Sequence, residues 1–329
     1  MGSFGFAYSS PERIAHDLQA VRQSEHHDAA DSKAKPLLGQ ACGLFHANFF
    51  MFPPRIAPTR EQAEAAIGAL AKALGDCEPA LSDLHHVDTS SAALPELEAQ
   101  LEAVWPHRPE LLSFHLGLPP AQVISKAQGL GICVAVTATR LEEAQAIEAS
   151  GADVVIAQGI EAGGHRGCFD PEAEDPGHST ADLVRILAAR CRLPIVAAGG
   201  IMDREDIATM LAAGASAVQL GTAFLSCEES GASPEHKRFL LHEHQRDTVI
   251  TRSFSGRPAR GLHNRFIARM DEGAALPFPL QHQLSAGLRR SAVERGDGEY
   301  QSLWAGTGYR RCRSESVASL IDRLAPGFT

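Results

Sequence analysis

The chain has 329 residues, of which 44% are hydrophobic, with a formal net charge of -10 and a sequence pI near 5.8. That length allows one large domain or two small ones, and the acidic balance argues against nucleic acid or an anionic membrane as the main partner. Seven cysteines without a C-x-x-C spacing argue against a disulfide framework and a metal site, and because neither a transmembrane segment nor a signal peptide is visible, we expect a cytoplasmic protein.

The N-terminal part begins like the end of a strand–loop unit that enters a helix. Ser10 as a capping residue and Pro11 at the first helical position predict the start of that helix. An apolar stretch that ends at Asn48 predicts a buried strand. The expected elements are a helix over 11–22, a surface loop over 24–38, a strand over 39–49, a helix over 59–74, a loop over 75–94 and a helix over 94–104.

From residue 111 onwards, short apolar strands alternate with helices. The strands are expected over 111–117, 131–138, 151–159, 193–201 and 214–225. The helices are expected over 120–128, 140–150, 179–190 and 204–213. Strands that are apolar on both faces and that alternate with helices indicate repeated βα units around a buried parallel sheet.

The alternation stops after residue 225. A helix is expected over 235–242, an extended segment over 248–256, irregular structure beyond it and a terminal helix over 314–324. We therefore predict a barrel portion over 1–225 and a helical or irregular appendage over 226–329, packed together as a single functional domain.

Two neighbouring strands are each expected to end in glycines. Gly199 and Gly200 close the strand PIVAAGG, and the segment Gln219-Leu220-Gly221-Thr222 closes the next one. Glycine lets main-chain N–H groups approach an anion closely, and paired sites of this kind bind phosphate at the last strands of many barrels. The alternative is two tight βα turns that need glycine for their geometry alone.

A glycine-dense loop follows the strand that ends at Gln158. Gln158 could bond the edge of a heterocycle through both its donor and its acceptor. His165, between GG and RG, is the candidate proton acceptor, with stabilisation of its own loop as the alternative. Arg166 would either attract an anionic substrate or pair with Glu161 or Asp170.

Two further polar residues belong to predicted strands. Asn48 could bond a ligand or cap a turn, and capping is favoured when the residue is taken alone. His115 shares a strand face with Ser113, and it would either line the pocket or fill the barrel interior.

The sequence as a whole resembles the nitronate monooxygenases of the FMN-dependent barrel type, formerly called 2-nitropropane dioxygenases. The resemblance implies a TIM-type (β/α)8 barrel, an FMN cofactor and His165 in a proton-abstracting or substrate-orienting role. It also implies FMN contacts from Asn48, Gln158, Gly163, Gly200, Gln219, Gly221 and Thr222. His115 and Arg166 are the residues that we expect to contact the substrate. The matching stretches, which cover nearly the whole chain, are GSFGFAYSSPE, the Asn48 strand, SFHLGLP, VAVTATRLEEAQAIEASGADVVIAQGIEAGGHRG, PIVAAGGI, GASAVQLGTAFL, TRSFSGRPARGLHNRF and QSLWAGTG.

Members of this family oxidise alkyl nitronates with O2 to a carbonyl compound and nitrite, and propionate 3-nitronate, a metabolic poison, is the implied substrate class. The partners implied are thus this small molecule and O2, with a homodimer left open. Two alternatives remain: a barrel of the same type that reduces its FMN with NAD(P)H, acting on a quinone or an enoyl thioester, and a degenerate barrel that binds a phosphate ligand without catalysis.

The family pattern begins with a strand of the type PIIQAPM and a helix, and both come before the position at which this sequence starts. We therefore expect a barrel that lacks its first strand–helix unit and is open at that gap.

Overall fold

The computed structural model describes residues 2–31, 45–53, 57–74 and 94–325. Its centre is a parallel sheet of seven strands in the order β1-β2-β3-β4-β5-β7-β8. The strands are β1 (Gly2–Gly5), β2 (Phe45–Phe50), β3 (Leu111–His115), β4 (Cys133–Ala138), β5 (Val154–Gln158), β7 (Ile195–Ala198) and β8 (Ala217–Gln219).

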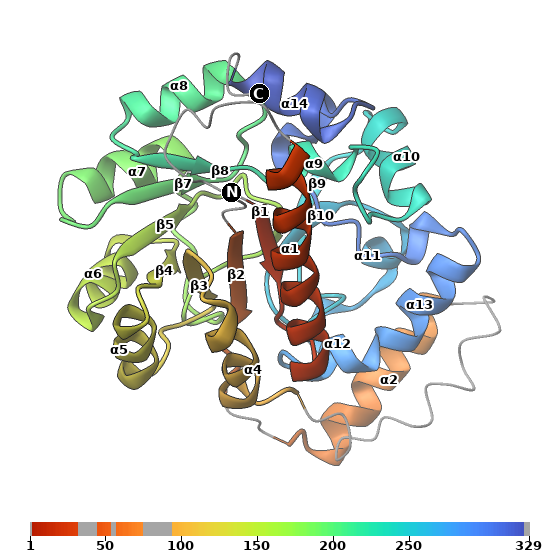
Figure 1. Ribbon diagram of the computed structural model, residues 1–329. Coiled ribbons are helices and arrows are strands. Elements are labelled where there is room, and N and C mark those ends of the chain that lie inside the picture. Colours follow the sequence, from red (N-terminus) through yellow and green to blue (C-terminus); the bar gives the residue numbers. More distant parts are fainter. Residues whose placement is uncertain (1, 32–44, 54–56, 75–93, 326–329) are drawn as a thin grey trace.

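Helices follow the strands around the outside of the curled sheet (Figure 1). This is the architecture of a TIM-type barrel, and in the described part of the chain β1 and β8 form its two unpaired edges. The outer helices are α1 (Pro11–Asp31), α4 (Leu97–Val104), α5 (Ala121–Gly129), α6 (Leu141–Ser150), α7 (Thr180–Ala188) and α8 (Arg204–Ala212), with a 3-10 turn η2 (Trp105–His107) after α4.

The strands divide their side chains between two environments, because successive residues point to opposite faces. On β2 and β3, Ala47, Phe49, Leu112 and Phe114 are fully buried in the large hydrophobic cluster beneath the outer helices. The residues between them face the barrel interior, and the register pairs Asn48 with Ser113. The polar residues that concern the site therefore lie on the inner face.

A second body of structure follows the barrel. It contains a three-stranded antiparallel sheet in the order β6-β10-β9, in which β6 belongs to the glycine-dense loop of the barrel. Its elements are β6 (Gly164–His165), α9 (Thr222–Leu225), α10 (Pro234–His242), β9 (Thr248–Thr251), β10 (Ala259–Leu262), α11 (Arg265–Arg269), η3 (Glu272–Ala274), α12 (Leu280–Leu284), α13 (Ala286–Glu294), η4 (Gly298–Tyr300), η5 (Thr307–Arg311) and α14 (Val317–Leu324).

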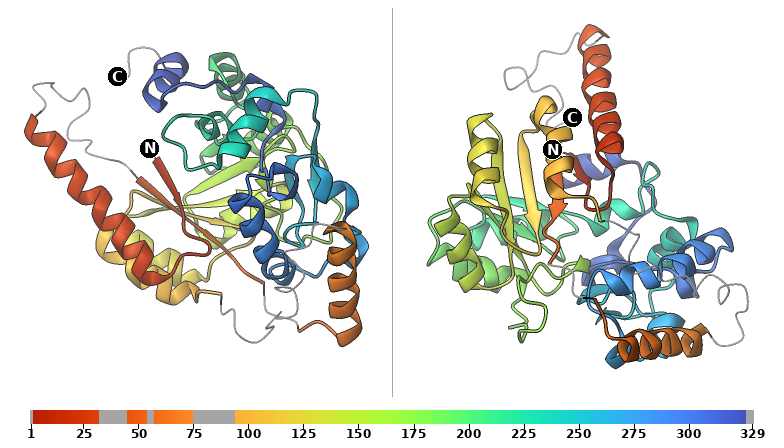
Figure 2. Two further views of the ribbon diagram at one scale, coloured as in Figure 1. Left: turned by 90° about the vertical axis from the view of Figure 1, so that its right-hand side faces the viewer. Right: turned by 90° about the horizontal axis from the view of Figure 1, so that it is seen from below.

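Helix α2 (Arg60–Leu74) packs in this second body rather than on the sheet. Its residues Leu70 and Leu74 are buried in one cluster with Phe254 and Phe266. Figure 2 shows α2 beside the C-terminal helices, far from the outer end of α1. One hydrophobic cluster thus contains residues from before and after residue 225, where the sequence predicts the boundary between barrel and appendage. That boundary stays a prediction.

Three sequence expectations about secondary structure are wrong. The loop expected over 24–38 is helical as far as Asp31, because residues 23–31 contain neither glycine nor proline and continue a helix that packs on α4. The single strand expected over 214–225 is a short strand followed by α9, which begins after Gly221. The segment after 256, expected to be irregular, holds β10, α11, α12 and α13.

Several expectations fall partly on residues outside the described ranges. These are the remainder of the 24–38 loop, the first part of the strand over 39–49 and nearly all of the loop over 75–94. None of the described helices combines the length and the apolar character that a membrane crossing needs.

Candidate active site

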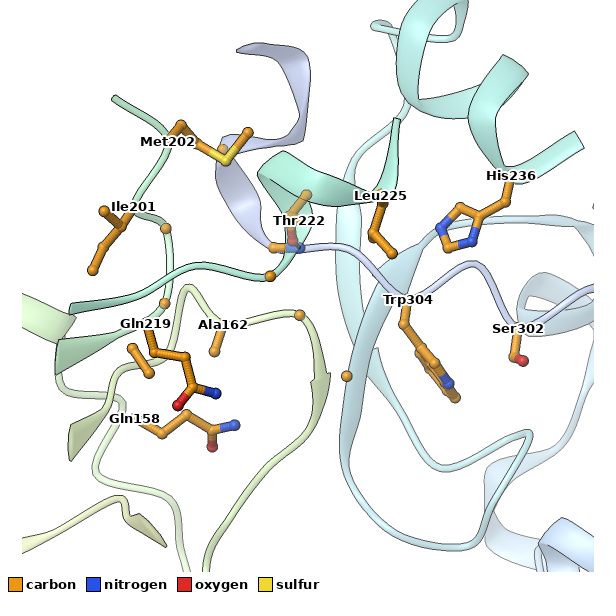
Figure 3. A pocket seen from close by; sticks show the side chains of 18 residues that line it. Gln158, Ala162, Ile201, Met202, Gln219, Thr222, Leu225, His236, Ser302 and Trp304 are labelled. Carbon is orange, nitrogen blue, oxygen red and sulfur yellow. Dashed lines mark hydrogen bonds between the residues drawn. The ribbon is translucent and has the colours of Figure 1, made fainter. Parts of the chain in front are cut away.

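The carboxyl ends of β5, β7 and β8 meet around a cavity of about 400 Å³. The structure brings six of the predicted site residues together on its wall: Gln158, Gly163, Gly200, Gln219, Gly221 and Thr222. In Figure 3, Gln158 and Gln219 lie on one side of this cavity, and Trp304, Ser302 and His236 lie on the other. The cavity has the size of a small-molecule or cofactor site.

Glycine is required at two places on this wall. Gly200 has φ +71°, a left-handed conformation that side chains disfavour, and a Cβ there would lie 3.0 Å from Cβ of Glu161. A Cβ on Gly163 would lie 2.6 Å from the main chain of Ala305 and Gly306. Close packing of the loops that form the cavity explains both glycines.

The rim also presents main-chain donors. Among the described residues, the N–H groups of Gly200 and Gly221 donate to no other main-chain or side-chain acceptor. A Cβ built on Gly221 meets no atom within 4 Å, so the space in front of it is open. This arrangement fits a phosphate held by glycine N–H groups, and the amides of Gln158 and Gln219 fit the polar edge of a flat ring system.

Gln158 is occupied mainly by its own loop. Its Nε2 donates to the carbonyl of His165 at 2.9 Å, and its Oε1 accepts from the N–H of Gly167 at 2.7 Å and from Arg166 at 3.1 Å. One N–H of the side-chain amide remains for a ligand. Gln158 therefore shapes the loop that carries His165 while it lines the cavity.

Arg166 is 1% exposed and is held within the same loop. Its Nε donates to Asp175 at 2.7 Å, and its Nη1 donates to the carbonyl of Gly159 at 2.8 Å. The pairing expected with Glu161 or Asp170 is wrong. Glu161 instead accepts bonds from the N–H and the hydroxyl of Thr180, both at 2.9 Å. The contacts of Arg166 are those of a loop anchor.

His165 lies in a second cavity of about 210 Å³. Its ring centroid is 5.6 Å from the rings of Phe50, Phe278 and Trp304. Burial, together with a smaller contribution from nearby positive charge that includes Arg257, lowers its pKa to about 3. His165 is therefore neutral at ordinary pH.

The tautomer of His165 is coupled to its hydrogen-bond partner. Ser255 Oγ lies 3.0 Å from His165 Nε2 and 3.1 Å from the carbonyl of Arg257. The hydroxyl has a single hydrogen, so Nε2 donates to Ser255 when that hydrogen goes to the carbonyl, and Nε2 accepts when it does not. In the first arrangement Nδ1 is the unprotonated, basic atom of the ring.

His115 contacts the same loop from behind. Its Nε2 donates to the carbonyl of His165 at 3.1 Å, and burial lowers its pKa to about 4. His115 is not among the residues that line either cavity. The contacts favour an interior residue that orients the loop, and a contact with substrate stays a prediction.

Asn48 belongs to a buried polar chain on the inner face of β2 and β3. His46 Nε2 lies 2.5 Å from Ser113 Oγ, and Ser113 donates to Asn48 Oδ1 at 2.7 Å. This chain fixes the amide oxygen of Asn48 and leaves its nitrogen as a donor. Asn48 does not line the 400 Å³ cavity, so its contact with a cofactor stays a prediction.

The two cavities adjoin, since Ser302 and Trp304 line both. Sequence reasoning missed most of the second body's contribution to them. Trp304 had a signal, because it lies in QSLWAGTG, one of the stretches that carry the family resemblance. Tyr8, from the N-terminal part of the chain, had the same kind of signal, because it lies in GSFGFAYSSPE. No local pattern indicated His236, His282 and Arg289.

Comparison with known proteins identifies relatives. The family model described as nitronate monooxygenase matches residues 45–327. A nitronate monooxygenase of Pseudomonas aeruginosa is 41% identical over 304 residues, which cover 90% of this chain and 86% of that protein. A nitronate monooxygenase of Paraburkholderia phytofirmans is 43% identical over 249 residues, which cover 74% of this chain and 66% of that protein.

Solved structures agree with these matches. The nitroalkane oxidase of Streptomyces ansochromogenes has a TM-score of 0.82 and 34% identity, with 98% of this chain and 86% of that chain covered. FabK of Thermotoga maritima has a TM-score of 0.67 and 24% identity, with 98% and 82% covered, and this likeness concerns the fold alone.

Proposed function

Because the chain belongs to the nitronate monooxygenase family, we propose that it oxidises alkyl nitronates, such as propionate 3-nitronate, with O2 to a carbonyl compound and nitrite. The observation that carries this proposal is a neutral imidazole, hydrogen-bonded to Ser255, in a small cavity that adjoins one of cofactor size.

The larger cavity is proposed to hold FMN. Gly200, Gly221 and Thr222 would bind the phosphate, and Gln158 and Gln219 would face the polar edge of the ring system. Bound FMN would take electrons from the substrate and pass them to O2. The open donors of Gly200 and Gly221 and the amides of Gln158 and Gln219, which line the same cavity, support this assignment.

His165 is proposed to act as a proton acceptor. When a neutral nitroalkane binds, Nδ1 takes the proton from the carbon beside the nitro group, and Ser255 holds the ring through Nε2. The rings of Phe50, Phe278 and Trp304 form an apolar surround for the imidazole. When a nitronate is supplied, its carbon is already deprotonated and this step is not needed.

The visible absorption spectrum of the purified protein, with and without added FMN, tests the cofactor assignment. A flavin spectrum and nitrite release from an added nitronate under air are expected. Colourless protein that takes up no FMN would favour the non-catalytic barrel. Bleaching of bound flavin by NAD(P)H without O2, in the absence of nitrite release, would favour the reductase.

Two further expectations accompany this function. The protein is predicted to act in the cytoplasm, and a homodimer is one assembly to be tested by size-exclusion chromatography with light scattering.

A further inference from the structure

A third cavity, of about 500 Å³, lies outside the candidate active site. It shares no lining residue with either of the two cavities described above. Its wall is formed by the turn over 252–257, by η3 with the segment that follows it, and by the loop after β6. Phe278 lies between this third cavity and the small one, because it lines the third cavity and its ring centroid is 5.6 Å from that of His165.

A buried arginine faces this third cavity without an acidic partner. Arg257 lines the cavity and is only 2% exposed. Its Nη2 donates to the carbonyl of Cys168, whereas its Nε is buried and has no hydrogen-bond partner among the described residues. The charge of Glu143 acts on Arg257 from a distance, but the Glu143 carboxylate accepts from the N–H groups of Thr139 at 2.6 Å and Phe169 at 2.8 Å.

This arrangement leaves a positive charge poorly compensated inside the protein. A buried guanidinium without a carboxylate partner is costly, because the protein interior solvates charge poorly. Burial accordingly lowers the pKa of Arg257. An anion that reaches Arg257 offsets this penalty, and the planar guanidinium gives it directional hydrogen bonds of the kind that a carboxylate accepts.

Two carboxylates at the rim restrict which anion fits. Glu172 is 76% exposed and pairs with Arg252 at 2.7 Å. Glu272 is also exposed, and it accepts from the N–H of Arg252 and from Ser253 Oγ, both at 3.1 Å. Water screens these exposed charges far more than that of Arg257. Their repulsion still disfavours a dianion such as phosphate, so a monoanion is favoured.

The remainder of the lining is mostly apolar. It includes Phe278, Leu280, Ala275 and four prolines. The volume lies within the range of small-molecule sites, which typically combine an apolar wall with a few well-placed polar groups. Such a wall suits a flat hydrocarbon ring, and Arg257 supplies the polar group.

We propose that this third cavity binds a small aromatic carboxylate, with its carboxylate against Arg257 and its ring among Phe278, Leu280 and the prolines. The site is separate from the cavities proposed for the cofactor and the nitronate. It therefore does not depend on the proposed function.

Benzoate is the probe, and calorimetry measures its binding. Benzamide has the same ring without the charge, and it should bind at least about tenfold more weakly than benzoate. Inorganic phosphate has charge without a ring, and it should also bind more weakly. Equal affinities for benzoate and benzamide would overturn the role of Arg257, and tighter binding of phosphate would overturn the aromatic ligand.

Three variants locate the bound benzoate. Arg257→Met should raise its Kd at least about tenfold, and so should Ala275→Phe, which places a ring in the same cavity. Arg289→Met is the matched control, because Arg289 lines the small cavity around His165 instead, and it should leave the Kd unchanged. A thermal melt shows which variants are folded.

The variants also contain the result that would overturn the proposal. A loss of benzoate binding in Arg289→Met alone would place benzoate in the small cavity. If Arg257→Met does not fold, Ala275→Phe decides, and unchanged affinity in that folded variant would refute the third cavity as the site.

The unaltered protein provides a test that needs no variant. The Kd for benzoate should be the same with and without saturating FMN, because the third cavity does not adjoin the proposed cofactor site. Displacement of benzoate by FMN would place it in the larger cavity at the strand ends and would overturn the proposal. Failure of every nitronate to yield nitrite, with benzoate binding still dependent on Arg257, would refute the proposed function and leave this site standing.

Discussion

Ser255 is the hydrogen-bond partner of His165: its Oγ lies 3.0 Å from His165 Nε2 and 3.1 Å from the carbonyl of Arg257. The direction of this bond decides which nitrogen of the imidazole is basic. Two predictions follow from the pair.

Replacing His165 with Asn should slow the oxidation of a neutral nitroalkane by about 100-fold to 10,000-fold, because the proton acceptor is lost. Oxidation of the preformed nitronate should fall far less, since its carbon is already deprotonated. The measurement is nitrite release from both forms, normalised to bound flavin. Loss of flavin with unchanged turnover per flavin would remove His165 from the mechanism.

Replacing Ser255 with Ala should lower the rate with a neutral nitroalkane by about tenfold, since the imidazole loses the hydrogen-bond partner that orients it. Ser226→Ala is a matched control. Ser226 is also buried and also donates to a carbonyl, that of Arg313 at 2.8 Å, but it lies outside the site. Equal effects of the two substitutions would show that only general stability had changed.

Stability should depend on pH through buried histidines. Burial lowers the pKa of His46, His115 and His236 to about 4 and those of His165 and His282 to about 3. Unfolding restores a value near 6.5, so the unfolded chain binds more protons as the solution is acidified below that pH.

The free energy of unfolding should therefore be complete above about pH 6.5 and fall as the pH decreases from there, by up to about 1.4 kcal/mol per pH unit for each such histidine. Urea denaturation at pH 7.5, 6.0 and 5.0 measures this slope. His46→Gln should reduce it by the share of one group. A free energy that stays level across these pH values would contradict the histidine assignment.

Replacing Gly221 with Val should weaken FMN binding by at least about tenfold while stability changes little. The added atoms meet no protein atom near Cβ, and they stand at the mouth of the larger cavity. Gly231→Val is the control, since a Cβ there also meets nothing and Gly231 does not line the cavity. Unaltered FMN affinity in Gly221→Val would argue against a phosphate at this rim.

Local sequence patterns predicted the barrel better than the segment that follows it. Each βα unit carries its own periodicity and turn glycines, so the strands around Gln158 and Gly200 could be placed from neighbouring residues alone. Helices α11, α12 and α13 are short, and they owe their stability to burying residues such as Phe266 and Leu288 against distant partners. A local pattern carries little of that information.

The same distinction applies to the site. The glycines and glutamines around the larger cavity follow directly from strand ends, and the structure brings them together. The sequence suggested Glu161 or Asp170 as partners of Arg166. Its partner is Asp175 instead, and the path of a long loop brings the two side chains together. Arg289 and Tyr8 come from opposite ends of the chain, and their meeting at His282 depends on packing that no sequence spacing encodes.

The pairing of β6 with β10 places His165 where the glycine-dense loop of the barrel meets the segment that follows residue 225. The proposed phosphate contacts Gly200, Gly221 and Thr222 lie on the barrel rim, whereas Ser255, His282 and Arg289 come from the segment beyond it. Sequence divergence within that segment can therefore change which substrates are accepted without changing the proposed phosphate contacts. A family built in this way can broaden or narrow its substrate range while the residues of the barrel that are proposed to bind the cofactor phosphate stay the same.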